Sequence, residues 1–383
     1  MTDLARLFLK LGFVAFGGPA AHIAMMEDEV VERRGWLSRQ RFLDLVGATS
    51  LIPGPNSTEM TMHVGYERAA WRGLVVAGAC FIGPAALVTL AFAYVYVRWG
   101  TLPEIEPFLY GIKPAVIAVI LMAVWRLGRK AVKGWRLAIL GVGVATAVLA
   151  GLNELVALAA GGVLGMAWLL SGIARPDRGG KAAAVPPILV RPAWQDLAAG
   201  AGAAGVAATV SLWKLGLFFL KVGAVLYGSG YVLVSFLRGD LVARWGWLTE
   251  GQLLDAIAIG QFTPGPVLST ATFIGYLVAG WAGAAVATIA IFLPSFVFVL
   301  LLNPLVTKLR QSTWSAAFLD AINAASVGLM IAVLVQLGVS TLVSWPAWVI
   351  AGAAALASWR FKVNAAWLVG GGALLGYVLR AWA

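Results

Sequence analysis

Long apolar stretches separated by short polar connections fill most of this sequence. Several stretches are long enough to cross a hydrocarbon core of about 30 Å, and strict alternation of polar and apolar positions is absent. In lipid this pattern indicates helices. We therefore predict an all-α polytopic membrane protein with about 13 membrane segments, at residues 4–25, 42–66, 73–97, 106–127, 136–152, 154–174, 194–212, 215–237, 252–277, 282–303, 316–338, 343–358 and 363–381.

The composition agrees with this pattern. The chain has 383 residues, of which 61% are hydrophobic and 12% charged, whereas soluble domains carry about 25% charged residues. The net charge of +11 comes from basic residues in the short connections, which is typical of positive-inside topology, so we do not expect nucleic acid as a partner. Cys80 is the single cysteine, which excludes a disulfide framework, and Lys10 interrupts the first apolar stretch, which argues against a cleaved signal peptide.

The chain contains an internal repeat. The string Phe8-Leu9-Lys10 returns at 219–221, Gly35-Trp36-Leu37 at 246–248, and Pro53-Gly54-Pro55 at 264–266, all at one shift of 211 residues. Over residues 8–55, sixteen of forty-eight positions are identical to their equivalents. A duplicated apolar chain with glycine- and proline-broken segments at matching places is typical of a secondary transporter. We expect one transporter repeat at 1–174, a linker at 175–193, and a second repeat at 194–383.

The connections carry opposite charge patterns in the two halves. The connection at 126–136 holds five basic residues and its equivalent at 336–346 holds none, and the same contrast separates 66–72 from 276–282. Since basic connections stay in the cytoplasm, the halves are predicted to have inverted topology, with a cytoplasmic N-terminus, a cytoplasmic linker and an external C-terminus. The segment 194–212 supplies the extra crossing that inversion needs. The broken segments 4–25 and 42–66, and their copies, are either full spans or re-entrant hairpins.

The two Pro-Gly-Pro elements are the first candidates for a binding site. Two prolines around a glycine end a helix, and a new helix can start directly after them. Free backbone N–H groups at such a start attract anions, and neighbouring hydroxyl and amide groups can add donors. A pair of structural kinks is the alternative reading. The residues of this candidate site are Pro55, Asn56, Ser57, Thr58, Thr263, Pro266 and Ser269.

Two further sets of residues could belong to the same site. Gly17-Gly18-Pro19 and Gly228-Ser229-Gly230 also break helices and are candidates to face the Pro-Gly-Pro elements, although close helix packing explains them equally well. Lys10 and Lys221 are repeat equivalents inside apolar stretches, where a lysine is costly. They could raise affinity for an anion, or they could extend to the membrane surface.

The remaining intramembrane polar residues suggest coupling and structural roles. Glu59 follows the first Pro-Gly-Pro by one helical turn, and together with His22 and His63 it is a candidate for proton coupling, with an ordinary polar contact as the alternative. Four charged residues that recur between the halves are structural or gate candidates, and we expect each acid to pair with a basic residue such as one of the two arginines; they are Asp44, Asp255, Arg33 and Arg244.

Motifs of enzymes are missing from the sequence. It has two histidines, and it lacks Cys/His metal spacing, a P-loop and a Gly-x-Ser-x-Gly elbow. We therefore expect no catalytic residues, no metal and no cofactor. Transport energy would then come from an ion gradient or from the membrane potential.

Several strings in the chain resemble one known family. Phe16-Gly17-Gly18-Pro19-x-x-His22, Pro53-Gly54-Pro55-Asn56-Ser57-Thr58 and Phe81-Ile82-Gly83-Pro84 resemble the N-terminal domain of the chromate ion transporter family. The second half, with Pro264-Gly265-Pro266 and Phe292-Leu293-Pro294, is similar to the paired domain of the long, two-domain members. The second half departs from the signature, because Leu233 stands at the equivalent of His22.

The resemblance implies chromate efflux across the cytoplasmic membrane of a prokaryote, with sulfate as a competing mimic and two domains of opposite orientation. The expected partners are thus a small inorganic oxyanion and the lipid bilayer, and the sequence leaves a homodimer open. Three alternatives remain at this point. They are a sulfate or other oxyanion transporter of the same fold, a membrane-embedded chromate reductase, and a non-transporting membrane scaffold or receptor.

Overall fold

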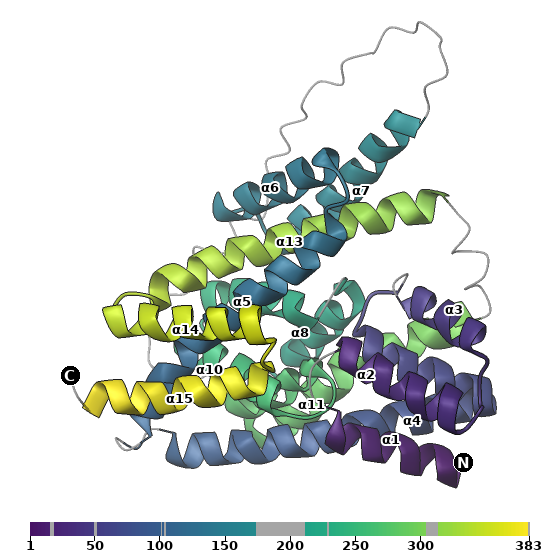
Figure 1. Cartoon of the computed structure of the whole chain (residues 1–383), viewed down its shortest axis with the longest axis horizontal. Coiled ribbons are helices and arrows are strands. Elements are labelled where there is room, and N and C mark those ends of the chain that lie inside the picture. The colour runs from purple at the N-terminus through teal and green to yellow at the C-terminus, as the bar shows by residue number, and fades with distance from the viewer. Residues whose placement is uncertain are drawn as a thin grey trace, which may run out of the picture.

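The computed structural model describes residues 1–15, 19–49, 52–100, 102, 105–173, 211–227, 230–303 and 313–381, and this part of the chain is helical (Figure 1). The elements of the first half are α1 (Thr2–Val14), α2 (Pro19–Glu27), η1 (Asp28–Arg33), α3 (Arg39–Thr49), α4 (Asn56–Trp99), α5 (Glu106–Ala131), α6 (Trp135–Leu149) and α7 (Glu154–Ile173). Those of the second half are α8 (Leu212–Val225), η3 (Gly230–Val232), α9 (Leu233–Phe236), η4 (Leu237–Arg244), α10 (Glu250–Phe262), η5 (Val267–Ser269), α11 (Thr270–Leu302), α13 (Thr313–Thr341), α14 (Trp345–Phe361) and α15 (Ala365–Ala381).

The two halves repeat one order of elements. A first helix (α1 or α8) is followed by short helices, a wide π-type turn (η1 or η4) and a third helix (α3 or α10). After the Pro-Gly-Pro element comes a long helical segment, and then three further helices. The domain boundaries at 174 and 194, the linker at 175–193 and the extra crossing expected at 194–212 lie almost wholly outside the described residues.

α4 is two helices folded back on each other. Its backbone leaves helical geometry at Ala69 and Ala70, where the φ of Ala70 is +48°. Gly65 and Gly73 lie eight residues apart in sequence, yet a Cβ atom on Gly65 would overlap the carbonyl oxygen of Gly73. The short limb of α4 (residues 56–68) therefore packs against its long limb (residues 71–99), and glycine at both contact points lets the two backbones approach.

α11 folds back in the same way. Its break falls at Ala279 and Gly280, and the φ of Gly280 is +58°. The hydroxyl oxygens of Thr272 and Thr288 are 2.7 Å apart, whereas sixteen residues of straight helix would separate them by about 24 Å. The short limb that follows the second Pro-Gly-Pro thus ends at residue 278, and the long limb of α11 is residues 281–302.

Five helical stretches of the described chain are long and apolar enough to cross a membrane: Asn56–Trp99, Glu106–Ala131, Glu154–Ser171, Val267–Leu302 and Thr313–Thr341. Large apolar side chains also face outward, and Trp213, Val343 and Trp367 expose 73%, 80% and 78% of their surface. Water would penalise such exposure, whereas lipid accepts it. The protein is a multi-pass membrane protein.

The predicted segments 4–25 and 42–66 are each divided. α1 and α2 occupy the first, and α3 with the short limb of α4 occupies the second. A short limb of thirteen residues reaches about 20 Å, which is less than the hydrocarbon thickness. The division of 42–66 has a chemical reason, because the Pro-Gly-Pro element removes backbone donors in the middle of this apolar stretch.

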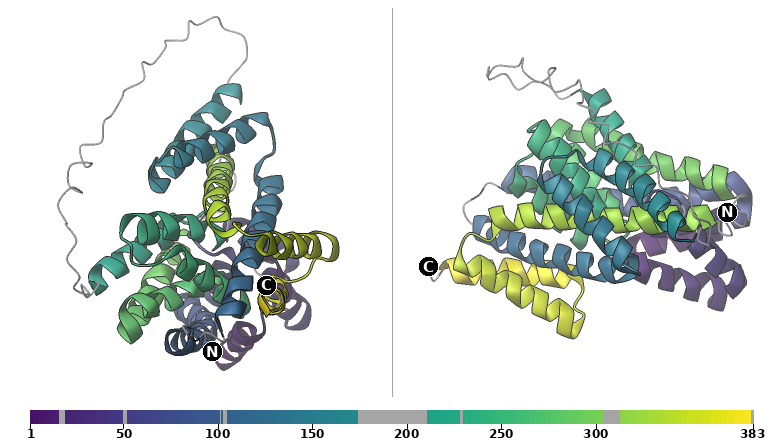
Figure 2. Two further views of the ribbon diagram at one scale, coloured as in Figure 1. Left: turned by 90° about the vertical axis from the view of Figure 1, so that its left-hand side faces the viewer. Right: turned by 90° about the horizontal axis from the view of Figure 1, so that it is seen from above.

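The two halves exchange their later helices. α5 of the first half packs on α14 and α15 of the second, whereas α13 of the second half packs on α6 and α7 of the first (Figure 1). The views from two further directions keep α13 beside α6 and α7 (Figure 2). Small residues allow the closest of these approaches, and a Cβ on Gly328 would overlap the carbonyl of Gly141. Neither half therefore forms its own separate helix bundle.

The long limbs of α4 and α11 run antiparallel. Near one end Gly78 faces the ring of Phe296, and near the other end the rings of Tyr94 and Trp281 lie 6.2 Å apart. As the contact moves toward the C-terminus of α4, it moves toward the N-terminus of this limb of α11. The two long limbs, which belong to equivalent elements of the two halves, thus point in opposite directions.

The Pro-Gly-Pro elements join the halves through their backbones. The N–H of Gly54 donates to the carbonyl of Leu226 at the end of α8 (2.7 Å), and the N–H of Gly265 donates to the carbonyl of Ala15 at the end of α1 (2.9 Å). Both glycines have positive φ, +142° and +88°, which a side chain would disfavour. Each break of one half is therefore held against the first helix break of the other.

Candidate functional site

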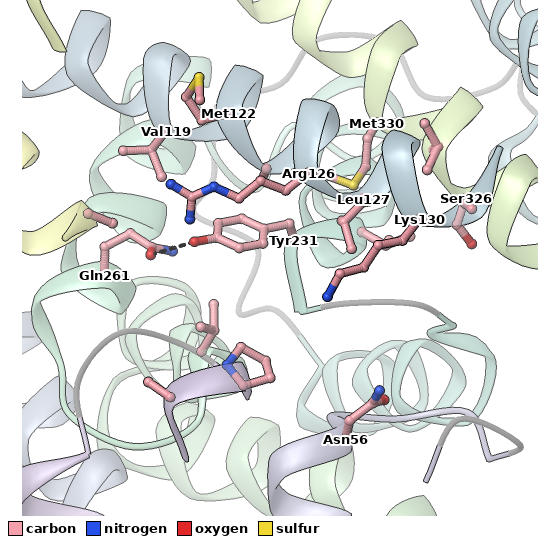
Figure 3. A pocket seen from close by; sticks show the side chains of 18 of the residues that line it. Asn56, Val119, Met122, Arg126, Leu127, Lys130, Tyr231, Gln261, Ser326 and Met330 are labelled. Carbon is pink, nitrogen blue, oxygen red and sulfur yellow. Dashed lines mark hydrogen bonds between the residues drawn. The ribbon is translucent and has the colours of Figure 1, made fainter. Parts of the chain in front are cut away.

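A cavity of about 850 Å³ lies where the helix breaks of the two halves meet (Figure 3). Its wall includes residues of both Pro-Gly-Pro regions, of the break after α1, of η3, and of α5, α13 and α15. Non-helical backbone at membrane depth is tolerated where protein packs it or where it lines a cavity. The arrangement meets the second condition for all of these breaks.

The first Pro-Gly-Pro contributes Asn56 to the cavity wall, and the second contributes Thr263, Gly265 and Val267. Asn56 is the first residue of α4, and Pro55 before it has extended backbone. The first N–H groups of a helix have no partner inside that helix, so this start offers backbone donors beside the Asn56 amide. An anion could be bound here without a lysine on the same element.

The hydroxyl residues after the breaks lie behind the cavity wall instead of on it. Ser57, Thr58 and Ser269 are buried, with exposed fractions of 2% or less, and they do not line the cavity. Thr89 on the long limb of α4 lies 3.2 Å from the hydroxyl of Thr263 and 3.1 Å from that of Ser269. These hydroxyl groups hold the second break against α4.

Sequence reasoning missed the basic residues of the cavity. The segment 126–136 was predicted to be a connection, but Arg126 and Lys130 belong to the last turns of α5 and line the cavity, and Lys133 follows them. Lys362, between α14 and α15, also lines it. The spacing of four residues between Arg126 and Lys130, directly after an apolar helix, is the signal that could have revealed them.

The break of the first half also covers a buried acid. Glu59 is fully buried in the short limb of α4, and Ser295 donates to its Oε1 at 3.4 Å. A Cβ on Gly54 would overlap this carboxylate, so the glycine leaves room for it. One turn further, Nδ1 of His63 donates to Oδ1 of Asn303 at 2.7 Å. His22 is buried as well and meets the ring of Phe81 edge-on.

Lys10 and Lys221 do not line the cavity and form ion pairs instead. Lys10 pairs with Glu29 at 2.9 Å, and Lys221 pairs with Asp240 at 2.5 Å. Asp240 is the repeat equivalent of Glu29. Glu29 and Asp240 are 8% and 6% exposed, so each π-type turn presents a nearly buried carboxylate to the lysine of the preceding helix. The two pairs join the same elements in both halves.

Arg33 and Arg244, named as possible partners of Asp44 and Asp255, form their described ion pairs with other acids. Arg33 pairs with Asp28 and Glu29, and Arg244 pairs with Asp240. The physical reason is local, because these acids lie four or five residues away on the same π-type turn. Gln40 donates to Asp44, and the hydroxyl of Tyr96 donates to Asp255 at 2.8 Å.

Some candidates fall outside the described residues, namely Gly17, Gly18, Gly228 and Ser229. Their neighbours are described: Pro19 lines the cavity, and Gly230 is buried against Val267 and Leu268. Within the described ranges, no group of three or more His, Cys, Asp or Glu side chains is arranged to hold a metal ion.

Comparison with known proteins identifies the family. The family described as Chromate transporter matches residues 2–166 and again residues 213–377. This chain belongs to the chromate transporter family. The match covers two copies of the family domain, so the resemblance noted in the sequence is confirmed, and chromate transporters are transport proteins and not enzymes. No solved structure matches the chain.

Curated relatives in the chromate transporter family align over nearly the whole chain. The chromate transport protein of Cupriavidus metallidurans is 33% identical over 99% of this chain and 93% of its own length. The probable chromate transport protein of Synechococcus elongatus is 32% identical over 94% of this chain and 90% of its own length. The chromate transport protein of Pseudomonas aeruginosa is 31% identical, covering 98% and 92%.

Proposed function

We propose that this protein exports chromate from a prokaryotic cytoplasm by alternating access. The observation that carries the proposal is the cavity at which both Pro-Gly-Pro breaks meet two cationic residues of α5. Helix starts and cationic side chains are the groups that recognise tetrahedral oxyanions in proteins. Sulfate has the same shape and charge as chromate, so the same cavity accommodates it as a competitor.

Topology supports placing the cavity on the cytoplasmic side of the membrane. The basic residues at the end of α5 and between α14 and α15 line one cavity, which the positive-inside rule assigns to the cytoplasmic side. The antiparallel packing of the long limbs of α4 and α11 supports opposite orientation of the two repeats. In this arrangement the described conformation is open inward, and movement of one set of helices against the other exposes the site outward.

The driving force is the membrane potential. An inside-negative potential favours loss of anions from the cytoplasm by about 2.3 kcal/mol per charge per 100 mV, and a dianion gains about twice this amount. Proton coupling is assigned to Glu59 and His22. Glu59 is fully buried and its Oε2 has no hydrogen-bond partner in the described part of the chain, which suits a group that takes up and releases a proton.

Uptake of labelled chromate into inside-out vesicles tests the proposal. We expect saturable uptake that is driven by a lumen-positive potential and inhibited by excess sulfate, with an imposed pH gradient measuring proton coupling. If the vesicles took up sulfate but not chromate, the mechanism would stand and sulfate would be the substrate instead of chromate. If no oxyanion were transported, the proposed function would be refuted and the non-transporting scaffold would become the favoured alternative.

A further inference from the structure

The wall of the cavity that α5 forms carries two basic side chains that pair with no described acidic residue. Arg126 and Lys130 lie four residues apart on α5 and project into the cavity from the same face (Figure 3). Asp320 is the one acidic residue among the described residues that line the cavity, and it pairs with Lys133 at 2.6 Å. Within the described ranges, neither Arg126 nor Lys130 forms an ion pair. Arg126 and Lys130 therefore face the cavity together from one helix, and Lys362 lines it from between α14 and α15.

The partners that Arg126 does have are neutral. One guanidinium nitrogen donates to the hydroxyl of Ser358 at 3.2 Å, and the side chain lies beside the ring of Tyr231 (Figure 3). A guanidinium carries five N–H donors in a rigid fork that matches the oxygens of a carboxylate or phosphate-like group. A single hydroxyl contact leaves most of this fork available to a ligand in the cavity.

A neutral donor faces the same space. The hydroxyl of Tyr231 donates to Oε1 of Gln261 at 3.0 Å, which fixes the orientation of the amide. The amide nitrogen Nε2 of Gln261 is buried and has no hydrogen-bond partner among the residues that the structure describes. Both residues line the cavity, and Figure 3 shows them beside Arg126, with Asn56 at the opposite side. A buried donor without an acceptor is costly, and an oxyanion would supply the missing acceptor.

We propose that Arg126 and Lys130 form the charge-recognition site for the transported anion and select doubly charged tetrahedral oxyanions over singly charged ones. The proposal rests on the proposed transport function and deepens it. Arg126, with Gln261, binds the anion in the cavity, and Lys130, one turn nearer the end of α5, supplies the second charge. Two cations one turn apart on α5 attract a dianion more strongly than a monoanion, because each charge of the anion adds its own Coulomb attraction.

Equilibrium binding of labelled chromate to the purified full-length protein tests this site. The variants are Arg126→Gln, Lys130→Gln and the double variant, and the competitors are sulfate, which is doubly charged, and perchlorate, which is tetrahedral and singly charged. The matched control is Arg129→Gln. Arg129 is exposed on the same turns of α5 but does not line the cavity, so this variant removes the same charge without touching the site.

We expect Arg126→Gln to weaken chromate binding at least about tenfold, because it removes charge-assisted hydrogen bonds. In the double variant the preference for sulfate over perchlorate should collapse, while Arg129→Gln should keep the wild-type affinity and preference. Equal loss of dianion and monoanion binding, or wild-type binding in both single variants, would overturn the proposal. If Arg129→Gln weakened chromate binding as much as Arg126→Gln does, the proposal would also be overturned, because the effect would then come from the net charge of the protein and not from the cavity.

The outcome also separates this site from the proposed function. If the wild-type protein binds chromate and the variants bind it equally well, the charge-recognition site fails while transport stands. If the wild-type protein binds no oxyanion, the proposed function fails first and this inference fails with it. Lys130→Gln guards against misfolding, because Lys130 is exposed at the helix end, and loss of dianion preference in this well-folded variant is expected on its own.

Discussion

The last turns of α5 and of α13 are equivalent in the repeat but differ in chemistry. Arg126 and Lys130 of α5 correspond to Gln336 and Ser340 of α13. The shift here is 210 residues, the same shift that relates the connections 66–72 and 276–282. The first two line the cavity, whereas Gln336 accepts a hydrogen bond from Arg238 at 2.7 Å and Ser340 bonds its own helix. The side chains at the breaks also differ in chemistry, because Asn56 and Glu59 correspond to Val267 and Thr270.

Features kept in both halves have structural partners. The lysine–carboxylate pairs, the hairpins of α4 and α11, and the bonds from Gly54 and Gly265 to the opposite half are all present twice. The lesson is that duplication supplied the scaffold and later divergence supplied the ligand chemistry. Substitutions at repeated positions should therefore affect folding, and those at diverged positions should affect the anion.

The largest effect is expected at a repeated glycine. Gly65→Leu forces a side chain into the carbonyl of Gly73 and opens the α4 hairpin, at a cost of about 3 kcal/mol or more. We expect loss of monodisperse protein in size-exclusion chromatography after extraction. Gly83→Leu is the control, because open space surrounds Gly83. Normal folding of Gly65→Leu would show that the hairpin contact is dispensable.

A smaller and more specific effect is expected at a diverged acid. Glu59→Gln removes the proton-carrying group while keeping its shape, so uptake driven by a pH gradient should fall to background and potential-driven uptake should persist. Vesicle uptake under each gradient measures the two components. Glu32→Gln, at an exposed position, is the control. Unchanged pH-driven uptake in Glu59→Gln would remove Glu59 from proton coupling.

Making the first break resemble the second sharpens the comparison further. Asn56→Val places at the start of α4 the residue that the second half has at Val267. Losing one hydrogen bond should weaken chromate binding about three- to tenfold. Binding assays on Asn56→Val and on the converse, Val267→Asn, provide the measurement. An Asn56→Val protein with wild-type affinity would mean that its amide does not contact the anion.

The smallest effect on the ligand is expected at the repeated lysines. Lys10 and Lys221 face Glu29 and Asp240 and not the cavity, so the double variant Lys10→Gln, Lys221→Gln should bind chromate with unchanged affinity. Its thermal stability should fall by a small amount, because partly exposed ion pairs contribute about 1 kcal/mol or less each. A large fall in affinity would instead place these lysines in the anion site.

Much of the fold could be predicted from the sequence. Apolar stretches and the shift of 211 residues indicated the helices and the repeat, because lipid enforces long helical segments and Pro-Gly-Pro breaks them. The hairpins could not be read in the same way. Tyr66–Arg72 looks like an ordinary polar connection, and only the contact between Gly65 and Gly73 reveals how tightly α4 turns back.

The candidate site was predicted in part. Asn56 and Thr263 line the cavity, and the breaks of both halves meet, as repeat symmetry suggested. Arg126 was missed because positive-inside reasoning assigns basic residues to connections. A helix end that faces a cavity can have the same local sequence as a basic connection, so the sequence does not distinguish the two. Lys10 attracted attention because a buried charge is costly, but its partner Glu29 lies nineteen residues away on a π-type turn that no local pattern predicts.

The exchange of helices between the halves sets an order for biosynthesis. During synthesis α6 and α7 enter the membrane well before α13, which is the helix they pack on. They must wait for residues 313–341, and until then the last turns of α5 border an incomplete cavity. The first half therefore reaches its final structure only after most of the second half has been made, so translation that stops between the repeats should yield a substrate for membrane quality control.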